Sequence, residues 1–137
     1  MALLETTNAQ RKRRVTGECP VKVVLGGTVQ AGDPLGYNSG WIWSVSATTY
    51  QPKLIAGEAG CSGDTITAYP MAIVEVTHIA ASTGTAGERV AVADTGYYAS
   101  AASNTPDIGY VASVADDSLS SKIFCFPLMA QLAVARA

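Results

Sequence analysis

The sequence has few of the residues on which catalysis and metal binding usually depend. It contains one histidine, His78, and three widely separated cysteines, Cys19, Cys61 and Cys125, which form no C-x-x-C pair. A zinc site needs ligands at short, paired spacings, and nucleophilic catalysis needs a base beside the nucleophile. No phosphate-binding loop or nucleophile elbow occurs either. The sequence therefore predicts a protein that is not an enzyme and that holds no metal or other cofactor.

Charge and long hydrophobic runs are also scarce. Charged residues make up 15% of the chain and hydrophobic residues 48%, a balance that argues against disorder of the whole chain and against a coiled coil. The most apolar stretch, residues 123–134, is too short to span a bilayer and contains Pro127. The first residues lack the order of a secretory signal. We therefore expect no membrane contact and synthesis in the cytoplasm.

The chain is instead rich in small and β-branched residues, since Ala, Gly, Ser, Thr and Val supply more than half of it. Turn signals recur roughly every 8–12 residues, between segments that favour strands. Residues 31–37 and 38–40 are predicted turns, residues 54–64 a loop or broken helical turn, and residues 65–81 one long strand or two divided at Pro70. The predicted fold class is all-β, a small β-barrel or β-sandwich of short antiparallel strands.

The charge is divided between an N-terminal arm and a body. Residues 1–14 carry a net charge of +3, whereas the rest of the chain carries −5. Residues 1–16 are polar and lack an apolar period, so we predict an extended N-terminal arm there. Residues 17–137 then form a single β-rich domain with a short C-terminal tail. The acidic body by itself is a poor partner for nucleic acid.

The sharpest local feature of the arm is a run of four basic residues: Arg11, Lys12, Arg13 and Arg14. Such a run can bind nucleic acid weakly, remain a solvated segment, or order on a protein partner. Leu3 and Leu4 precede it and favour the protein partner, since they offer apolar anchors that a nucleic-acid tail does not need.

A pair of tryptophans is the second candidate for partner binding. Trp41 and Trp43 lie two residues apart in a segment, residues 40–51, that alternates between apolar and polar positions. Alternation of this kind places both rings on one face of a strand. Such a pair is usually part of a core, but at an interface the two rings would be anchors. The sequence is compatible with both roles.

Three groups of turn residues resemble those of the small capsid decoration proteins of tailed bacteriophages, also called cement or head-stabilising proteins. The first group matches a G-x-V-x-x-G-D-x-x-G corner: Gly27, Val29, Gly32, Asp33 and Gly36. The second matches a G-E-x-V corner: Gly87, Glu88 and Val90. The third precedes the last predicted hairpin: Ile108, Gly109 and Tyr110. The resemblance covers residues 21–128, and the basic run lies outside it.

This resemblance implies a structural protein of the virion, made in the host cytoplasm. It implies binding to the outside of the assembled capsid, stabilisation of the lattice of the major capsid protein, and self-association as a trimer or dimer. Its arm, residues 2–15, would reach neighbouring capsid subunits. We then expect Leu3, Leu4 and the basic run to lie on an acidic groove of the major capsid protein.

Two alternatives remain within the virion. One is a coat protein whose basic arm faces inward and binds the genome; the acidic body and the short basic run make nucleic acid the less favoured partner. The other is a minor tail or fibre module, although the long repeats typical of fibres are absent.

Overall fold

The computed structural model describes residues 13–44, 52–77, 86–92, 98–100, 107–114 and 120–127. Every named element within these ranges is a β-strand. The first six are β1 (Arg14–Glu18), β2 (Val21–Val24), β3 (Pro34–Asn38), β4 (Trp41–Ser44), β5 (Leu54–Ala56) and β6 (Thr65–Tyr69). The remaining five are β7 (Met71–Thr77), β8 (Arg89–Val92), β9 (Tyr98–Ser100), β10 (Asp107–Val114) and β11 (Ser120–Cys125).

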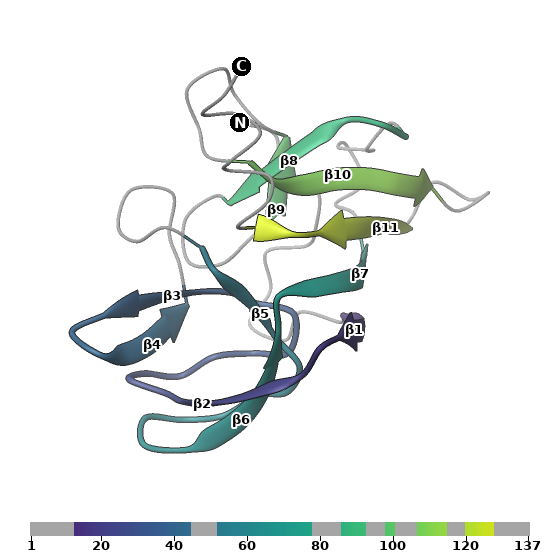
Figure 1. The fold of residues 1–137 in the computed structure, drawn as a ribbon. Coiled ribbons are helices and arrows are strands. Elements are labelled where there is room, and N and C mark those ends of the chain that lie inside the picture. The colour runs from purple at the N-terminus through teal and green to yellow at the C-terminus, as the bar shows by residue number, and fades with distance from the viewer. Residues whose placement is uncertain are drawn as a thin grey trace.

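The strands form two antiparallel sheets (Figure 1). One has six strands in the order β1-β7-β11-β10-β8-β9, and the other has five in the order β2-β6-β5-β3-β4. The two edges of the five-stranded sheet approach each other at an isolated bridge between Leu25 and Ile42. Neither sheet closes into a barrel. The all-β prediction is confirmed, and of its two forms the structure corresponds to the sandwich.

A bent ribbon of two strands connects the sheets. β1 pairs with β7 in the six-stranded sheet, and β2 pairs with β6 in the five-stranded sheet. Cys19 and Pro20 separate β1 from β2, and Pro70 separates β6 from β7. Because proline has no N–H to donate to a ladder, pairing is interrupted where both strands change sheet. Of the two forms predicted for residues 65–81, two strands divided at Pro70 is the one observed.

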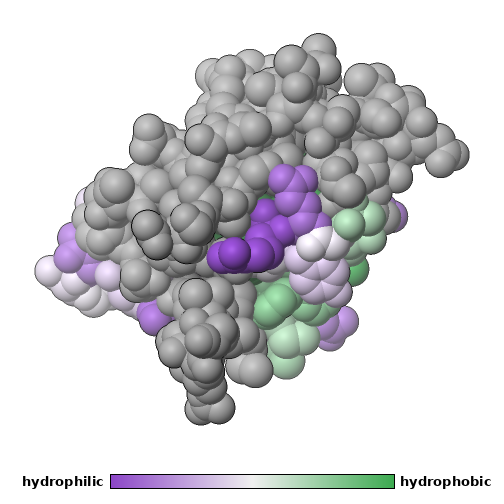
Figure 2. Space-filling model, turned by 90° about the horizontal axis from the view of Figure 1, so that it is seen from above, coloured by the Kyte–Doolittle hydropathy of each residue, from purple (hydrophilic) through white to green (hydrophobic). Residues whose placement is uncertain are grey.

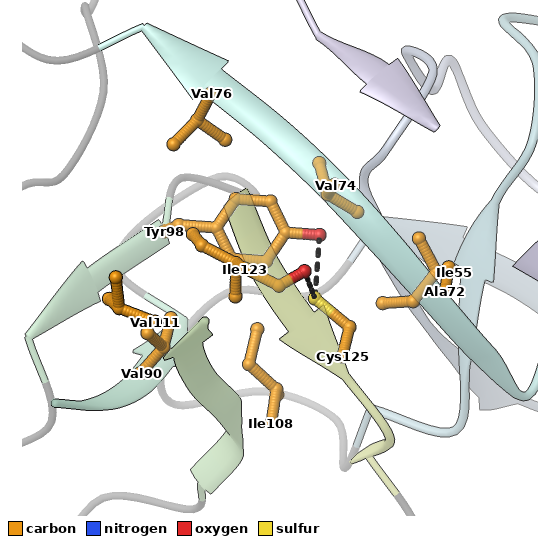
Figure 3. Packing of buried hydrophobic residues seen from close by; sticks show 10 residues of the cluster. All are labelled: Ile55, Ala72, Val74, Val76, Val90, Tyr98, Ile108, Val111, Ile123 and Cys125. Atoms are coloured by element: carbon orange, nitrogen blue, oxygen red, sulfur yellow. Dashed lines mark hydrogen bonds between the residues drawn. The ribbon is translucent and has the colours of Figure 1, made fainter. Parts of the chain in front are cut away.

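Each sheet has its own cluster of buried residues. The cluster of the six-stranded sheet is drawn in Figure 3 and comprises Ile55, Ala72, Val74, Val76, Val90, Tyr98, Ile108, Val111, Ile123 and Cys125. The cluster of the five-stranded sheet comprises Val23, Leu25, Val29, Leu35, Ile42, Ala56, Ile66 and Ala68. Ile55 joins the two halves, since it lies on β5 but packs in the cluster of the six-stranded sheet.

Three predicted boundaries differ from the structure. The segment predicted as a turn, residues 31–37, contains the start of β3, with Pro34 as its first residue, where a strand tolerates proline. The predicted loop over residues 54–64 begins with β5, which pairs with β3 and β6. Residues 14–16, predicted as part of the arm, lie in β1. For β1 and β5 the pairing partner is distant in sequence, so local composition did not indicate it. Residues 1–12 and the C-terminal tail fall outside the described ranges.

Candidate interaction surfaces

Arg13 of the basic run lies inside the folded body. Its side chain has no exposed area, and its Nη1 lies 2.5 Å from Oδ1 of Asp33, whose side chain is 2% exposed. Its guanidinium carbon lies 4.9 Å from the ring centre of Tyr98. A buried charge requires a partner of this kind. Arg13 is therefore engaged within the protein, which differs from the expectation that it contacts the capsid.

The Arg13–Asp33 pair belongs to a polar cluster between the sheets. Oδ2 of Asp33 accepts a hydrogen bond of 3.0 Å from the backbone N–H of Gln30, and the Tyr98 hydroxyl donates to the carbonyl oxygen of Gly32. Gly32 has φ +83°, and a Cβ there would lie 2.7 Å from Cδ of Arg13. Only glycine fits this backbone and this space. The cluster thus fixes the segment before β3 against β9 and the root of the arm.

The sequence did not predict the role of Tyr98, and it placed Asp33 in a predicted turn. For Asp33, the only sign of a special role in the sequence was its position directly after Gly32 and before Pro34. That position predicts a turn, because aspartate favours turns through bonds to nearby backbone. Nothing local identifies Arg13 as the partner, 20 residues away.

Arg14 is exposed, in contrast to the buried side chain of Arg13. In the register of β1 and β7 it lies opposite Glu75. Successive side chains of a strand point to opposite faces, so Arg13 and Arg14 are directed to different environments. The other predicted arm residues, Leu3, Leu4, Arg11 and Lys12, lie outside the described residues.

The two tryptophans share a face of β4, as predicted, but differ in burial. Trp41 is 48% exposed beside the β3–β4 turn, whereas Ile42 on the opposite face is buried. Trp43 packs over Gly26, where a Cβ would lie 2.5 Å from its ring carbon Cε2. Its Nε1 is buried and has no hydrogen-bond partner among the described residues. Trp41 is therefore available to a partner, while Trp43 covers the chain after β2.

The outer face of the six-stranded sheet carries an apolar cluster that sequence analysis did not single out. We call it the aromatic face; it consists of Met71, Ile73, Tyr110, Phe124 and Phe126. Its three rings contact one another, with centroids 5.1–6.0 Å apart. Met71, Ile73 and Tyr110 are among the exposed large hydrophobic residues. Seen from above, the described surface shows hydrophobic residues gathered beside hydrophilic ones (Figure 2).

Other kinds of site have little support in the described ranges. No group of three metal-ligating side chains occurs among the described residues. Cys19 and Cys61 are exposed free thiols, and Cys125 is a buried one. Within the same ranges no helix is long and apolar enough to cross a membrane. His78 lies outside the described residues.

Comparison with known proteins indicates a fold but not a family. No protein-family model matches the chain, and no curated protein is significantly similar to it in sequence. Among solved structures, it is similar to the head fiber gp8.5 N base of bacteriophage phi29, with a TM-score of 0.57 and 20% identity. The match covers 78% of this chain and 92% of that one. At this identity the likeness shows a shared fold.

Most of the residues on which the resemblance to decoration proteins rests lie in turns or in the core of the fold. Asp33 lies in the buried polar cluster, and Val90 and Ile108 have no exposed area. The N–H of Gly87 donates to the carbonyl oxygen of Val111, and the N–H of Val111 donates to that of Glu88. Most of these motif residues therefore belong to turns and core of the fold. Tyr110 is the exception, because it is exposed and lies on the aromatic face.

Proposed function

We propose that this chain is a structural protein of a tailed-bacteriophage virion, bound to the outside of the assembled head, where it stabilises the lattice of the major capsid protein. The observation that supports this most is the fold it shares, over nearly all of the solved chain, with the head fiber gp8.5 N base of phage phi29. The corner motifs that resemble those of decoration proteins point to the same class.

The basic run fits a protein partner better than nucleic acid. With the Arg13 side chain buried against Asp33, one of its four cations is not offered to phosphates. Affinity for nucleic acid depends on the number of phosphates neutralised, and Arg14 lies beside the carboxylate of Glu75 in the sheet register. We propose that Leu3, Leu4, Arg11, Lys12 and Arg14 contact the capsid, with Trp41 as an aromatic anchor. Many modest contacts repeated over a shell give high total avidity.

The experiment is co-sedimentation of the purified protein with assembled heads that lack it, and separately with free DNA, at low and high salt. We expect saturable binding to heads at a fixed ratio to capsid subunits and little binding to DNA. A variant lacking residues 2–12 should bind heads at least about tenfold more weakly, because ordering of an arm contributes selectivity for the assembled shell. DNA binding that disappears with salt, without head binding, would overturn the proposal.

A second candidate function is a module at the base of a head fibre, and the description of the phi29 neighbour as a fiber base favours it. Heating filled heads with and without the protein separates the two. A lattice stabiliser raises the temperature at which DNA is released, whereas a fibre base binds without changing it.

A further inference from the structure

The two central strands of the aromatic face present matched residues side by side. In the register of β7 and β11, Glu75 lies opposite Lys122, and Ile73 lies opposite Phe124. Met71 comes next on β7, and Phe126 directly follows the last residue of β11. On β7 the alternate positions hold Glu75, Ile73 and Met71. Along β11 and the residue after it they hold Lys122, Phe124 and Phe126. Each row thus has one charged residue and two large apolar residues, and the two charges have opposite sign.

These side chains are accessible in the single chain. Ile73 and Met71 are each 40% exposed, Tyr110 is 42% exposed, and Lys122 is exposed. An exposed apolar cluster bordered by charged residues is typical of a surface that binds another protein. Burial of the face against a partner removes this apolar area from water, which is the main favourable contribution to association.

The charges around the face indicate which partner fits. Arg14 and Lys122 are basic, whereas Glu75 and Glu18 on the same face are acidic. Because these two basic and two acidic charges cancel, the face offers nucleic acid or a strongly acidic protein no net attraction. Opposite the central pair, Glu75 and Lys122, a partner must present one basic and one acidic group, and the same two residues of a second copy do so.

We infer that the aromatic face binds the same face of a second copy of this chain, about a two-fold axis that runs along the strands between β7 and β11. Rotation about this axis exchanges β7 and β11. Glu75 of each copy then faces Lys122 of the other, and Ile73 of each copy faces Phe124 of the other. Each residue is used twice, as in any two-fold interface. A dimer is one of the two oligomers that the resemblance to decoration proteins implies, and its formation through this face does not depend on capsid binding.

The test uses charge reversal in the full-length protein and sedimentation velocity over a range of concentrations. The wild type should form a dimer. Glu75→Lys and Lys122→Glu, each alone, should weaken dimerisation at least about tenfold, because like charges then face each other twice. An equimolar mixture of the two single variants should recover the dimer, since every facing pair in the mixed dimer is again of opposite sign. The double variant should recover it as well.

If the dimer is recovered on mixing, Glu75 and Lys122 act between copies. An effect that came only from their contact within one sheet would remain in both variants after mixing. Arg14→Glu is the matched control: it reverses a charge in the same row, but Arg14 lies on β1, outside the β7–β11 pair, and the rotation does not bring it opposite Glu75 or Lys122, so dimerisation should change little. Circular dichroism confirms that each variant is folded. A wild-type monomer, a trimer, single variants that still dimerise, or a mixture that stays monomeric would each overturn the inference. None of these outcomes involves heads, so capsid binding is judged separately.

Discussion

The two sheets of this protein are connected by the bent ribbon of β1–β2 and β6–β7 but are stabilised differently. The cluster of the five-stranded sheet consists only of aliphatic side chains, such as Leu25 and Ile66. The cluster of the six-stranded sheet includes the Tyr98 ring, whose hydroxyl lies 3.9 Å from Sγ of Cys125 and whose face adjoins Arg13. Aliphatic burial tolerates many arrangements, whereas a buried ion pair requires one geometry. The polar cluster therefore holds the root of the arm in a defined place.

The largest expected effect comes from breaking that cluster. Arg13→Ala should lower the free energy of unfolding by about 3–5 kcal/mol, because it leaves the buried carboxylate of Asp33 without its cation. Urea unfolding followed by circular dichroism measures the change. Arg14→Ala is the matched control on the next residue, and since Arg14 is exposed its effect should stay within about 0.5 kcal/mol. Equal effects of the two substitutions would contradict the burial of Arg13.

A pair of core substitutions compares the sheets directly. Ile66→Ala in the five-stranded sheet and Ile123→Ala in the six-stranded sheet each remove a side chain that is at most 1% exposed. Each should cost about 2–5 kcal/mol through lost burial and the cavity left behind.

Because the bent ribbon of β1–β2 and β6–β7 runs through both sheets, both variants should still unfold in a single transition. Tryptophan fluorescence reports on the five-stranded sheet, which holds Trp41 and Trp43, and far-ultraviolet circular dichroism reports on the whole chain. Two separate transitions in either variant would show that the sheets unfold independently.

The smallest expected effect is on thiol reactivity. Cys19 and Cys61 are exposed and Cys125 is buried in the cluster of the six-stranded sheet. In the native protein two thiols should react rapidly with a chromogenic disulfide reagent, and the third only after unfolding or in the Arg13→Ala variant. Three rapid thiols in the wild type would contradict the burial of Cys125.

Local sequence determined much of this fold. Alternating β-branched residues gave an all-β class, Pro70 divided a long apolar segment into two strands, and Asn38, Ser39 and Gly40 marked the turn of the β3–β4 hairpin. These features depend on backbone preferences of a few neighbouring residues, and such preferences act before any tertiary contact forms.

Only the tertiary structure decided the surfaces. It buried Arg13 and exposed Arg14, although both belong to one basic run, and it exposed Trp41 while Trp43 covers Gly26. It also placed Glu75 beside Lys122 and Ile73 beside Phe124. The physical reason is sequence separation: the Tyr98 hydroxyl bonds a carbonyl 66 residues away, and β7 pairs with a strand more than 40 residues later. Local composition indicates that a residue lies in a strand, but the distant strand that pairs with it decides which side of that strand meets water.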